Sequence, residues 1–256
     1  MKVLGSLSQS FEFGRSLLRY RYQDCLFVLG HMRSGSTALS NILCSRPDVS
    51  GYGEAHVNHN KRLALRRLAV NQLRRDSWRP NTNCLFDKIL HSRLDDHAPD
   101  EFFRARVIFL VRTPTDSISS IVKLFAQIGK AEYQTHEEAA EYYVDRLAML
   151  EQHWHRFAAN RRIGLLHEQL IRDPDQALDA ISARLGISPP LENRYVSSAA
   201  SRRGGGGDPL VSGKYNRIEP AEPRPPLPQD SLEISSTLME QAQKRYEALK
   251  LLFTSG

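Results

Sequence analysis

The chain has 256 residues, of which 41% are hydrophobic and 25% are charged, and its formal net charge is +6. A chain of this length can bury a full core, and this composition is typical of a globular protein rather than a disordered or membrane protein. The basic residues are scattered, and no dense basic run with interleaved aromatics indicates a nucleic-acid partner. The excess charge fits either a solvated surface or an attraction for a small polyanion.

The cysteines and the hydropathy of the chain indicate the cellular compartment of the protein. Cys25, Cys44 and Cys84 have neither disulfide-framework nor metal-ligand spacing, and free cysteines in apolar runs usually behave as small buried hydrophobes. No apolar stretch approaches the ~20 residues that span a bilayer, and residues 1–22 lack the apolar core of a signal peptide. We therefore expect a cytoplasmic protein without integral membrane association.

Short apolar runs of strand character alternate with helical patterns along the chain. The strand runs are 25–30, 84–86, 106–111 and 163–167, and the helical patterns are 37–44, from Pro114 onward, 135–160, 174–185 and 230–253. Residues 106–111 (RVIFLV) are continuous, β-branched and aromatic, as in a strand covered on both faces. Strands that alternate with helices predict an α/β fold in which helices flank a central parallel sheet.

The sequence contains no internal repeat, and we predict one domain over residues 1–256. Within it, residues 1–22 form a short lead-in, residues 197–229 a Gly- and Pro-rich loop region, and residues 230–253 a C-terminal helix. Consecutive glycines at 204–207 argue against regular structure in that loop region.

A glycine- and serine-rich turn directly follows the first strand run. Residues 30–37 (GHMRSGST) lie between a strand and a helix, where backbone N–H groups and a helix N-terminus can hold an anion. The spacing is that of the nucleotide triphosphatase loop, but Ser36 occupies the lysine position and Arg33 supplies a cation instead. The predicted fold is therefore three-layered and P-loop-like, although such a turn alone is also compatible with a simple strand-to-helix connection.

The central strand run ends in a second cation. Arg112 stands where metal-dependent nucleotide sites place an aspartate that helps to hold Mg²⁺. Its guanidinium is a planar donor suited to a phosphate or a sulfonate. Together with the first loop, Arg112 indicates an anionic ligand that is held by side chains rather than through a metal ion.

These residues resemble the sulfotransferase family that uses 3′-phosphoadenosine 5′-phosphosulfate (PAPS). The family's 5′-phosphosulfate loop reads roughly [K/R]-S-G-[T/S]-T after the first strand, and residues 33–37 (RSGST) resemble its arginine version. Its 3′-phosphate motif is a strand ending in Arg, a Pro-containing turn and a Ser eight residues on, which matches Arg112 and Ser120. The arginine-type loop is most similar to the bacterial, carbohydrate and tyrosylprotein branch.

Weaker resemblance covers most of residues 24–215. Residues 167–174 (HEQLIRDP) resemble the family's Y-E-D-L…D-P stretch, with His167 in place of the usual tyrosine. Residues 202–204 (RRG) resemble a late basic-glycine element that closes over the 3′-phosphate. The aromatic that often follows the first loop and stacks on adenine is absent, because Ala38 stands there.

The resemblance implies transfer of a sulfuryl group from the co-substrate PAPS to a hydroxyl, without a metal. The nucleotide contacts that it implies are Arg33, Ser34, Gly35, Ser36, Thr37, Arg112, Ser120, Arg202, Arg203 and Gly204. Sulfuryl transfer resembles loose in-line phosphoryl transfer, in which positioning and charge stabilisation supply most of the catalysis. Arg33 and Lys88 would stabilise the developing charge, unless Lys88 is an ordinary solvated surface lysine.

The acceptor hydroxyl needs a general base within hydrogen-bond reach. Glu54 stands at the spacing from Arg33 seen in protein-tyrosine and many bacterial and carbohydrate sulfotransferases, and it is the predicted base. His91 is the alternative, because cytosolic small-molecule sulfotransferases use a His beyond the second strand. A metal site at Glu54, His56 and His59 is disfavoured, since their spacing matches no standard catalytic zinc motif.

Two other function classes stay open. A metal-dependent small-molecule kinase with an atypical P-loop would need Mg²⁺ ligands near the strand ends, where no Asp stands in the expected place. A non-catalytic nucleotide-binding module would keep the fold without the chemistry. For a sulfotransferase we expect a small metabolite or a carbohydrate as acceptor, bound by the variable segments 59–75, 94–103 and beyond 195.

Overall fold

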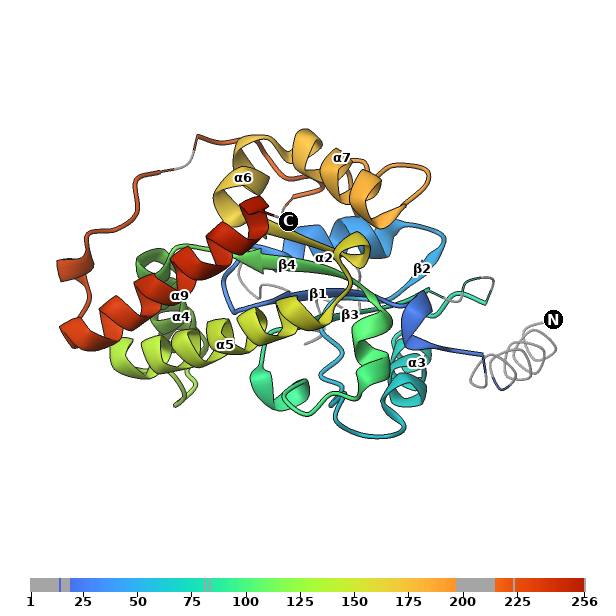
Figure 1. Ribbon diagram of the computed structural model, residues 1–256, viewed down its shortest axis with the longest axis horizontal. Helices are drawn as coiled ribbons and strands as arrows, with labels where there is room; N and C mark the ends of the chain where they lie inside the picture. The colour runs from blue at the N-terminus through green and yellow to red at the C-terminus, as the bar shows by residue number, and fades with distance from the viewer. Residues whose placement is uncertain are drawn as a thin grey trace.

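The computed structural model describes residues 14, 19–80, 82, 84–196, 215–222 and 224–255. Within these residues five strands form one sheet in which every neighbouring pair is parallel (Figure 1). From edge to edge the strands are β2 (Val49–Ser50), β3 (Cys84–Ile89), β1 (Leu26–Gly30), β4 (Arg106–Val111) and β5 (Arg162–Leu166). The predicted α/β architecture with a central parallel sheet is confirmed.

Helices cover both faces of the sheet and complete the three layers (Figure 1). One face packs against α2 (Ser36–Ser45), α6 (His167–Arg172) and α7 (Pro174–Leu185). The other packs against α3 (Ala64–Arg74), α4 (Pro114–Ile128), α5 (His136–Arg156) and α9 (Ser236–Ser255). The central strands are buried on both sides for this reason, which explains their continuous apolar runs.

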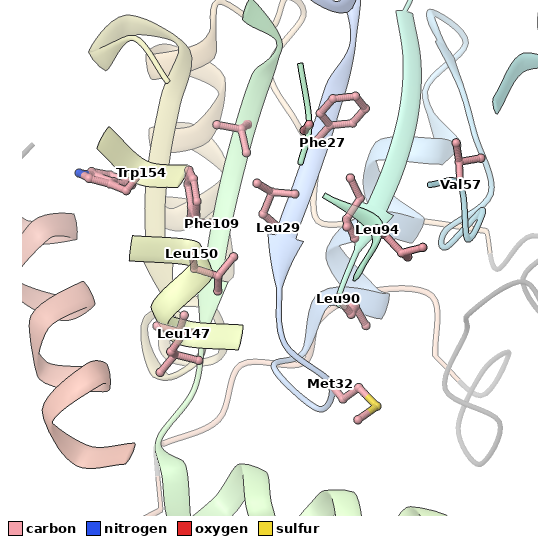
Figure 2. Close-up of a cluster of buried hydrophobic side chains, with 14 of the residues drawn as sticks. Phe27, Leu29, Met32, Val57, Leu90, Leu94, Phe109, Leu147, Leu150 and Trp154 are labelled. Atoms are coloured by element: carbon pink, nitrogen blue, oxygen red, sulfur yellow. The ribbon is translucent and has the colours of Figure 1, made fainter. Parts of the chain in front are cut away.

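Alternate residues of β1 show how the two layers share the sheet. Leu26 and Val28 lie in the cluster that contains α2 and α7, whereas Phe27 and Leu29 lie in the cluster that contains α5. Figure 2 shows Phe27 and Leu29 on the α5 side of the sheet, together with Phe109 of β4. Successive side chains of a strand point to opposite faces, so one short strand anchors both layers.

The predicted apolar stripe of the longest helix is buried as expected. Its members are Tyr143, Leu147, Leu150, Trp154 and Phe157, and Figure 2 shows three of them beside β4. The helix begins after Thr135, whose side chain accepts a hydrogen bond from the Glu138 backbone N–H. It ends at Arg156 rather than at the predicted residue 160, so Phe157 is buried just beyond its last turn. None of the helices in the described part of the chain combines the length and apolarity of a membrane-spanning segment.

Several element boundaries differ from the sequence predictions. Strand β3 continues through Asp87 and Lys88, although the predicted strand ended at Phe86, because the backbones of both residues pair with β1. His167 begins α6 instead of ending β5. The last helix begins at Ser236 rather than at residue 230, after a 3₁₀ turn at Gln229–Ser231. The first two shifts matter for the site, because they decide where Lys88 and His167 point.

Candidate active site

The first loop has the backbone of an anion-binding turn. It leaves the end of β1 at Gly30 and enters α2 at Ser36, as predicted. Arg33 and Gly35 both have left-handed backbone conformations, with φ of 66° and 86°. A Cβ atom on Gly35 would lie 2.5 Å from His167 Nδ1, so glycine is required there by packing as well as by φ. Such a turn directs backbone N–H groups toward one point at the helix N-terminus.

The two motifs that suggested an anionic ligand meet in space. Arg33 Nε donates a hydrogen bond to Ser120 Oγ over 2.9 Å, which joins the first loop to α4. Arg112 lies at the end of β4, beside the Gly30 end of β1. The loop, Arg112 and Ser120 therefore lie close together at the carboxyl ends of β1 and β4.

A cavity of about 420 Å³ opens beside Arg112 and Ser120, and none of residues 30–37 lines it. Its lining includes Arg112, Ser120, Lys123, His167, Glu168 and Arg224. Arg112 Nε is buried and has no hydrogen-bond partner among the described residues, while its Nη2 lies 3.8 Å from Asp116 Oδ2. Burial lowers the pKa of Arg112 from its ordinary value. A partly exposed guanidinium with a buried, unused Nε donor, next to a hydroxyl, suits a phosphate-sized anion.

A second group of polar residues lies on the β3 side of the loop. Lys88 is only 2% exposed, so it is not a solvated surface lysine. Its Nζ lies 3.5 Å from Thr37 Oγ1 and 3.9 Å from Glu54 Oε2, and thereby connects the first loop to Glu54. Burial raises the pKa of Glu54, and the neighbouring Lys88 and His56 act in the opposite direction. His56 Nδ1 is 3.5 Å from Glu54 Oε1.

His91, the other predicted base, is also near this group. It follows β3 closely, and its ring centroid lies 5.5 Å from that of Tyr142. Burial, followed by the positive charge of Arg93, lowers the pKa of His91 to about 4. Because that value is far below neutrality, His91 is an uncharged imidazole at neutral pH and retains the ability to accept a proton.

Buried Asp87 explains how Glu54 is positioned. Its Oδ1 accepts hydrogen bonds of 2.9 Å from the backbone N–H groups of Ala55 and Lys88, and its Oδ2 lies 3.1 Å from His59 Nε2. The segment after Glu54 is thereby attached to β3. The His59 side chain is buried in the core, so His59 and His56 do not share a site. The described residues contain no cluster of three or more His, Cys, Asp or Glu suited to a metal.

Arg146 of α5 is a site-supporting residue that the sequence analysis missed. It is fully buried and donates 2.9 Å hydrogen bonds to the carbonyls of Gly30 and Ile89, which end β1 and β3. It also forms a bidentate ion pair with Asp95, with distances of 2.7 and 3.0 Å. A charged residue beside the apolar stripe of the helix was the signal available, since Arg146 directly precedes Leu147.

His31 was missed in the same way. Its Nε2 accepts the Arg112 backbone N–H over 3.0 Å, so the ring proton resides on Nδ1, which donates to the Met32 carbonyl over 2.8 Å. Burial lowers the pKa of His31 to about 3, which keeps it neutral. The predicted nucleotide contacts at residues 202–204 lie outside the described residues, and Ala38 provides no aromatic surface for adenine.

Both the sequence and the fold of the chain are similar to those of known proteins. The sulfotransferase family model matches residues 25–102 and 96–190. The sulfotransferase domain of the Synechococcus PCC 7002 olefin synthase is 19% identical, with a TM-score of 0.57 over 88% of this chain and 94% of that chain. A sulfotransferase from Alicyclobacillus acidocaldarius is 15% identical, with a TM-score of 0.53 over 90% and 95% of the two chains.

A mouse sulfotransferase in complex with PAP is 17% identical, with a TM-score of 0.50 over 95% of this chain and 88% of that chain. No curated protein sequence is similar enough to this chain to count as a match. At these identities the structural likeness establishes a shared fold. Since the family model spans well over half of the sequence, the chain belongs to the sulfotransferase family, whose members are transferases of sulfo groups.

Proposed function

We propose that the protein transfers a sulfuryl group from PAPS to a hydroxyl of a small-molecule or carbohydrate acceptor. The observation that carries this proposal is the 2.9 Å hydrogen bond from Arg33 to Ser120, which joins the two motifs expected to bind the two ends of the donor. The related mouse enzyme was solved with PAP, adenosine 3′,5′-bisphosphate, which is the nucleotide that remains after PAPS has lost its sulfuryl group.

In this proposal each end of the donor has its own set of residues. The backbone N–H groups of residues 34–37 and the guanidinium of Arg33 bind the 5′-phosphosulfate at the start of α2. The 3′-phosphate enters the cavity of about 420 Å³, where Arg112 has a buried donor without a partner in the described residues and Ser120 offers a hydroxyl. Residues 202–204 are proposed as further 3′-phosphate contacts by the resemblance alone.

The transfer step uses the residues on the β3 side. The acceptor oxygen attacks sulfur, its proton moves to Glu54, and the bond between sulfur and the 5′-phosphate oxygen breaks to give a sulfate ester and PAP. Burial favours this role, because the pKa of Glu54 is raised and a stronger base accepts the proton more readily. Lys88, within 3.9 Å of Glu54 and 3.5 Å of Thr37, would stabilise the negative charge that develops on the leaving phosphate.

Calorimetric titration with PAP, ATP and Mg·ATP tests the nucleotide assignment. PAP should bind clearly more tightly than ATP, with or without Mg²⁺, because the site offers separate anion positions rather than a triphosphate cradle with its lysine. Incubation of radiolabelled PAPS with a panel of sugars and small alcohols then tests transfer. Preferred binding of Mg·ATP would contradict the proposal and favour a kinase.

Transfer should survive exhaustive treatment with EDTA. Ser36 and Arg112 occupy the positions at which metal-dependent nucleotide sites have their lysine and aspartate, and the charge of the donor is met by arginine and lysine side chains instead. The measurement is the rate of PAP release before and after removal of divalent cations. A loss of activity that Mg²⁺ or Mn²⁺ restores would show that transfer depends on a metal.

Arg112→Ala should weaken the binding of PAP far more than the binding of adenosine 5′-phosphate. Loss of one charge-assisted contact to the 3′-phosphate costs about 1.5–3 kcal/mol, which is a ten- to hundredfold change in Kd. Arg104→Ala is the matched control, because Arg104 is exposed and does not line the cavity. Equal losses for both nucleotides would show that Arg112 does not recognise the 3′-phosphate.

A further inference from the structure

His167 lies between the two predicted phosphate positions. It is the first residue of α6, it lines the cavity that contains Arg112 and Ser120, and its Nδ1 packs directly against Gly35 of the first loop. That nitrogen is buried and makes no hydrogen bond of ordinary geometry within the described residues, although the backbone of Ser34 lies close enough to favour the protonated ring. Burial of a polar atom without a hydrogen-bond partner costs free energy unless a ligand supplies the missing hydrogen bond.

The charged groups around this imidazole come from every element that packs against it. Arg112 approaches from the end of β4, Asp116 from α4, and Glu168 follows in α6. Lys123 of α4, Glu222 and Arg224 also line the same cavity. His31 lies close enough to His167 for a charge on His167 to lower the pKa of His31.

Without a nucleotide, these surroundings favour the neutral form of His167. Burial and then the positive charge of Arg112 lower the pKa of His167 to about 4, while the Ser34 backbone and Asp116 act in the opposite direction. A bound phosphate would reverse the balance, because it brings negative charge to the imidazole and also neutralises Arg112. An opposite charge within ~4–6 Å raises the pKa of a basic group by about 1–3.

We propose that His167 takes up a proton when the nucleotide binds and donates it in a hydrogen bond to a nucleotide phosphate. This inference rests on the proposed PAPS donor. Tyrosine, the residue usual at this position in similar enzymes, does not titrate near neutrality, so the linkage is a property of this chain. Protonation of His167 should increase the affinity for the nucleotide most at acidic pH. This increase should disappear as the pH rises through the pKa of His167 in the nucleotide-bound form.

The test is calorimetric titration with adenosine 3′,5′-bisphosphate at pH 6, in two buffers of different ionisation enthalpy. The difference in apparent heat gives the number of protons taken up on binding. Wild type should take up a larger fraction of a proton than His167→Gln and His167→Tyr, whose side chains cannot become charged. Between pH 8 and pH 5.5 the affinity of wild type should improve relative to both variants, by about tenfold for each unit by which the pKa of the nucleotide-bound form exceeds 5.5.

The comparison with variants is essential, because the phosphates of the nucleotide also titrate near pH 6 and release protons when a cationic site binds their dianions. Nuclear magnetic resonance of the imidazole Cε1–H of wild type supplies a second readout, with the His167 signal identified by its absence in His167→Gln. The signal should titrate at a higher pH when the bisphosphate is bound.

Each outcome has one meaning. If wild type binds the bisphosphate but takes up no more protons than either variant, and the His167 signal does not move, His167 does not take up a proton and the donor assignment stands. If wild type fails to bind the bisphosphate at any pH, the proposed donor is wrong, and the proposed proton uptake by His167 is wrong as well.

Discussion

Glu54→Gln should lower turnover by about 10²–10⁴, the usual contribution of a positioned general base. Glutamine keeps the shape of the side chain and removes only its ability to take a proton. The affinity for adenosine 3′,5′-bisphosphate should stay close to that of wild type, because Glu54 lies on the β3 side of the loop and does not line the Arg112 cavity. The measurement is kcat at saturating PAPS and acceptor, with folding checked by circular dichroism.

The pH dependence of the reaction gives an independent check. The turnover of wild type should fall as the pH drops through the pKa of Glu54, which burial raises above the ordinary value of a glutamate. Glu54→Gln should lose that acidic limb. His91→Asn is the matched comparison and should cause a smaller loss. Normal turnover of Glu54→Gln combined with an inactive His91→Asn would identify His91 as the base, even though its pKa of about 4 makes it a weak one.

Arg146→Met should destabilise the protein by about 3–5 kcal/mol, the usual consequence of removing one partner of a buried ion pair. Asp95 would remain fully buried without its guanidinium, and the carbonyls of Gly30 and Ile89 would lose their donors. The measurement is the free energy of unfolding from urea titration. Recovery of variant protein only in unfolded form agrees with the expectation.

A surface ion pair provides the control for this stability effect. Arg245 contacts Glu151 at 2.8 Å between α9 and α5, and both side chains are partly exposed. Arg245→Met should cost no more than about 1 kcal/mol. Similar losses for Arg245→Met and Arg146→Met would contradict the view that the buried position of Arg146 determines its effect. Adding Asp95→Asn to Arg146→Met should recover part of the loss, because the uncompensated charge disappears.

The parts of the fold that local chemistry determines could be predicted from the sequence. Residues 106–111 form a strand with the predicted bounds, and Pro114 begins the helix that follows it. Gly186 ends α7 in the left-handed conformation, with φ of 61°. In each case the signal is a property of a few neighbouring residues, such as β-branching, a missing backbone N–H or tolerance of positive φ.

The supporting residues of the site could not be predicted in this way. Lys88 was expected after a strand and on the surface or at the site, and the structure places it inside the strand and buries it. Arg146 and His31 bind backbone groups 116 and 81 positions away, so a local pattern can single out Arg146 as a charge beside an apolar stripe but cannot identify the partners of either residue. Tertiary contacts decide such positions, and hydrophobic periodicity carries no information about them.

The order of the strands also explains why a ligand would bind where it is proposed to bind. After β1 the chain fills the β3 side of the sheet, and it then crosses to begin β4 on the other side. The helices that follow β1 and β4 consequently leave toward opposite faces, α2 on one and α4 on the other. Diverging connections of this kind open a crevice outside the carboxyl ends of the two strands, known as a topological switch point. The crevice arises from chain connectivity alone, so its side chains can be exchanged in evolution or by design while the place for a nucleotide is retained.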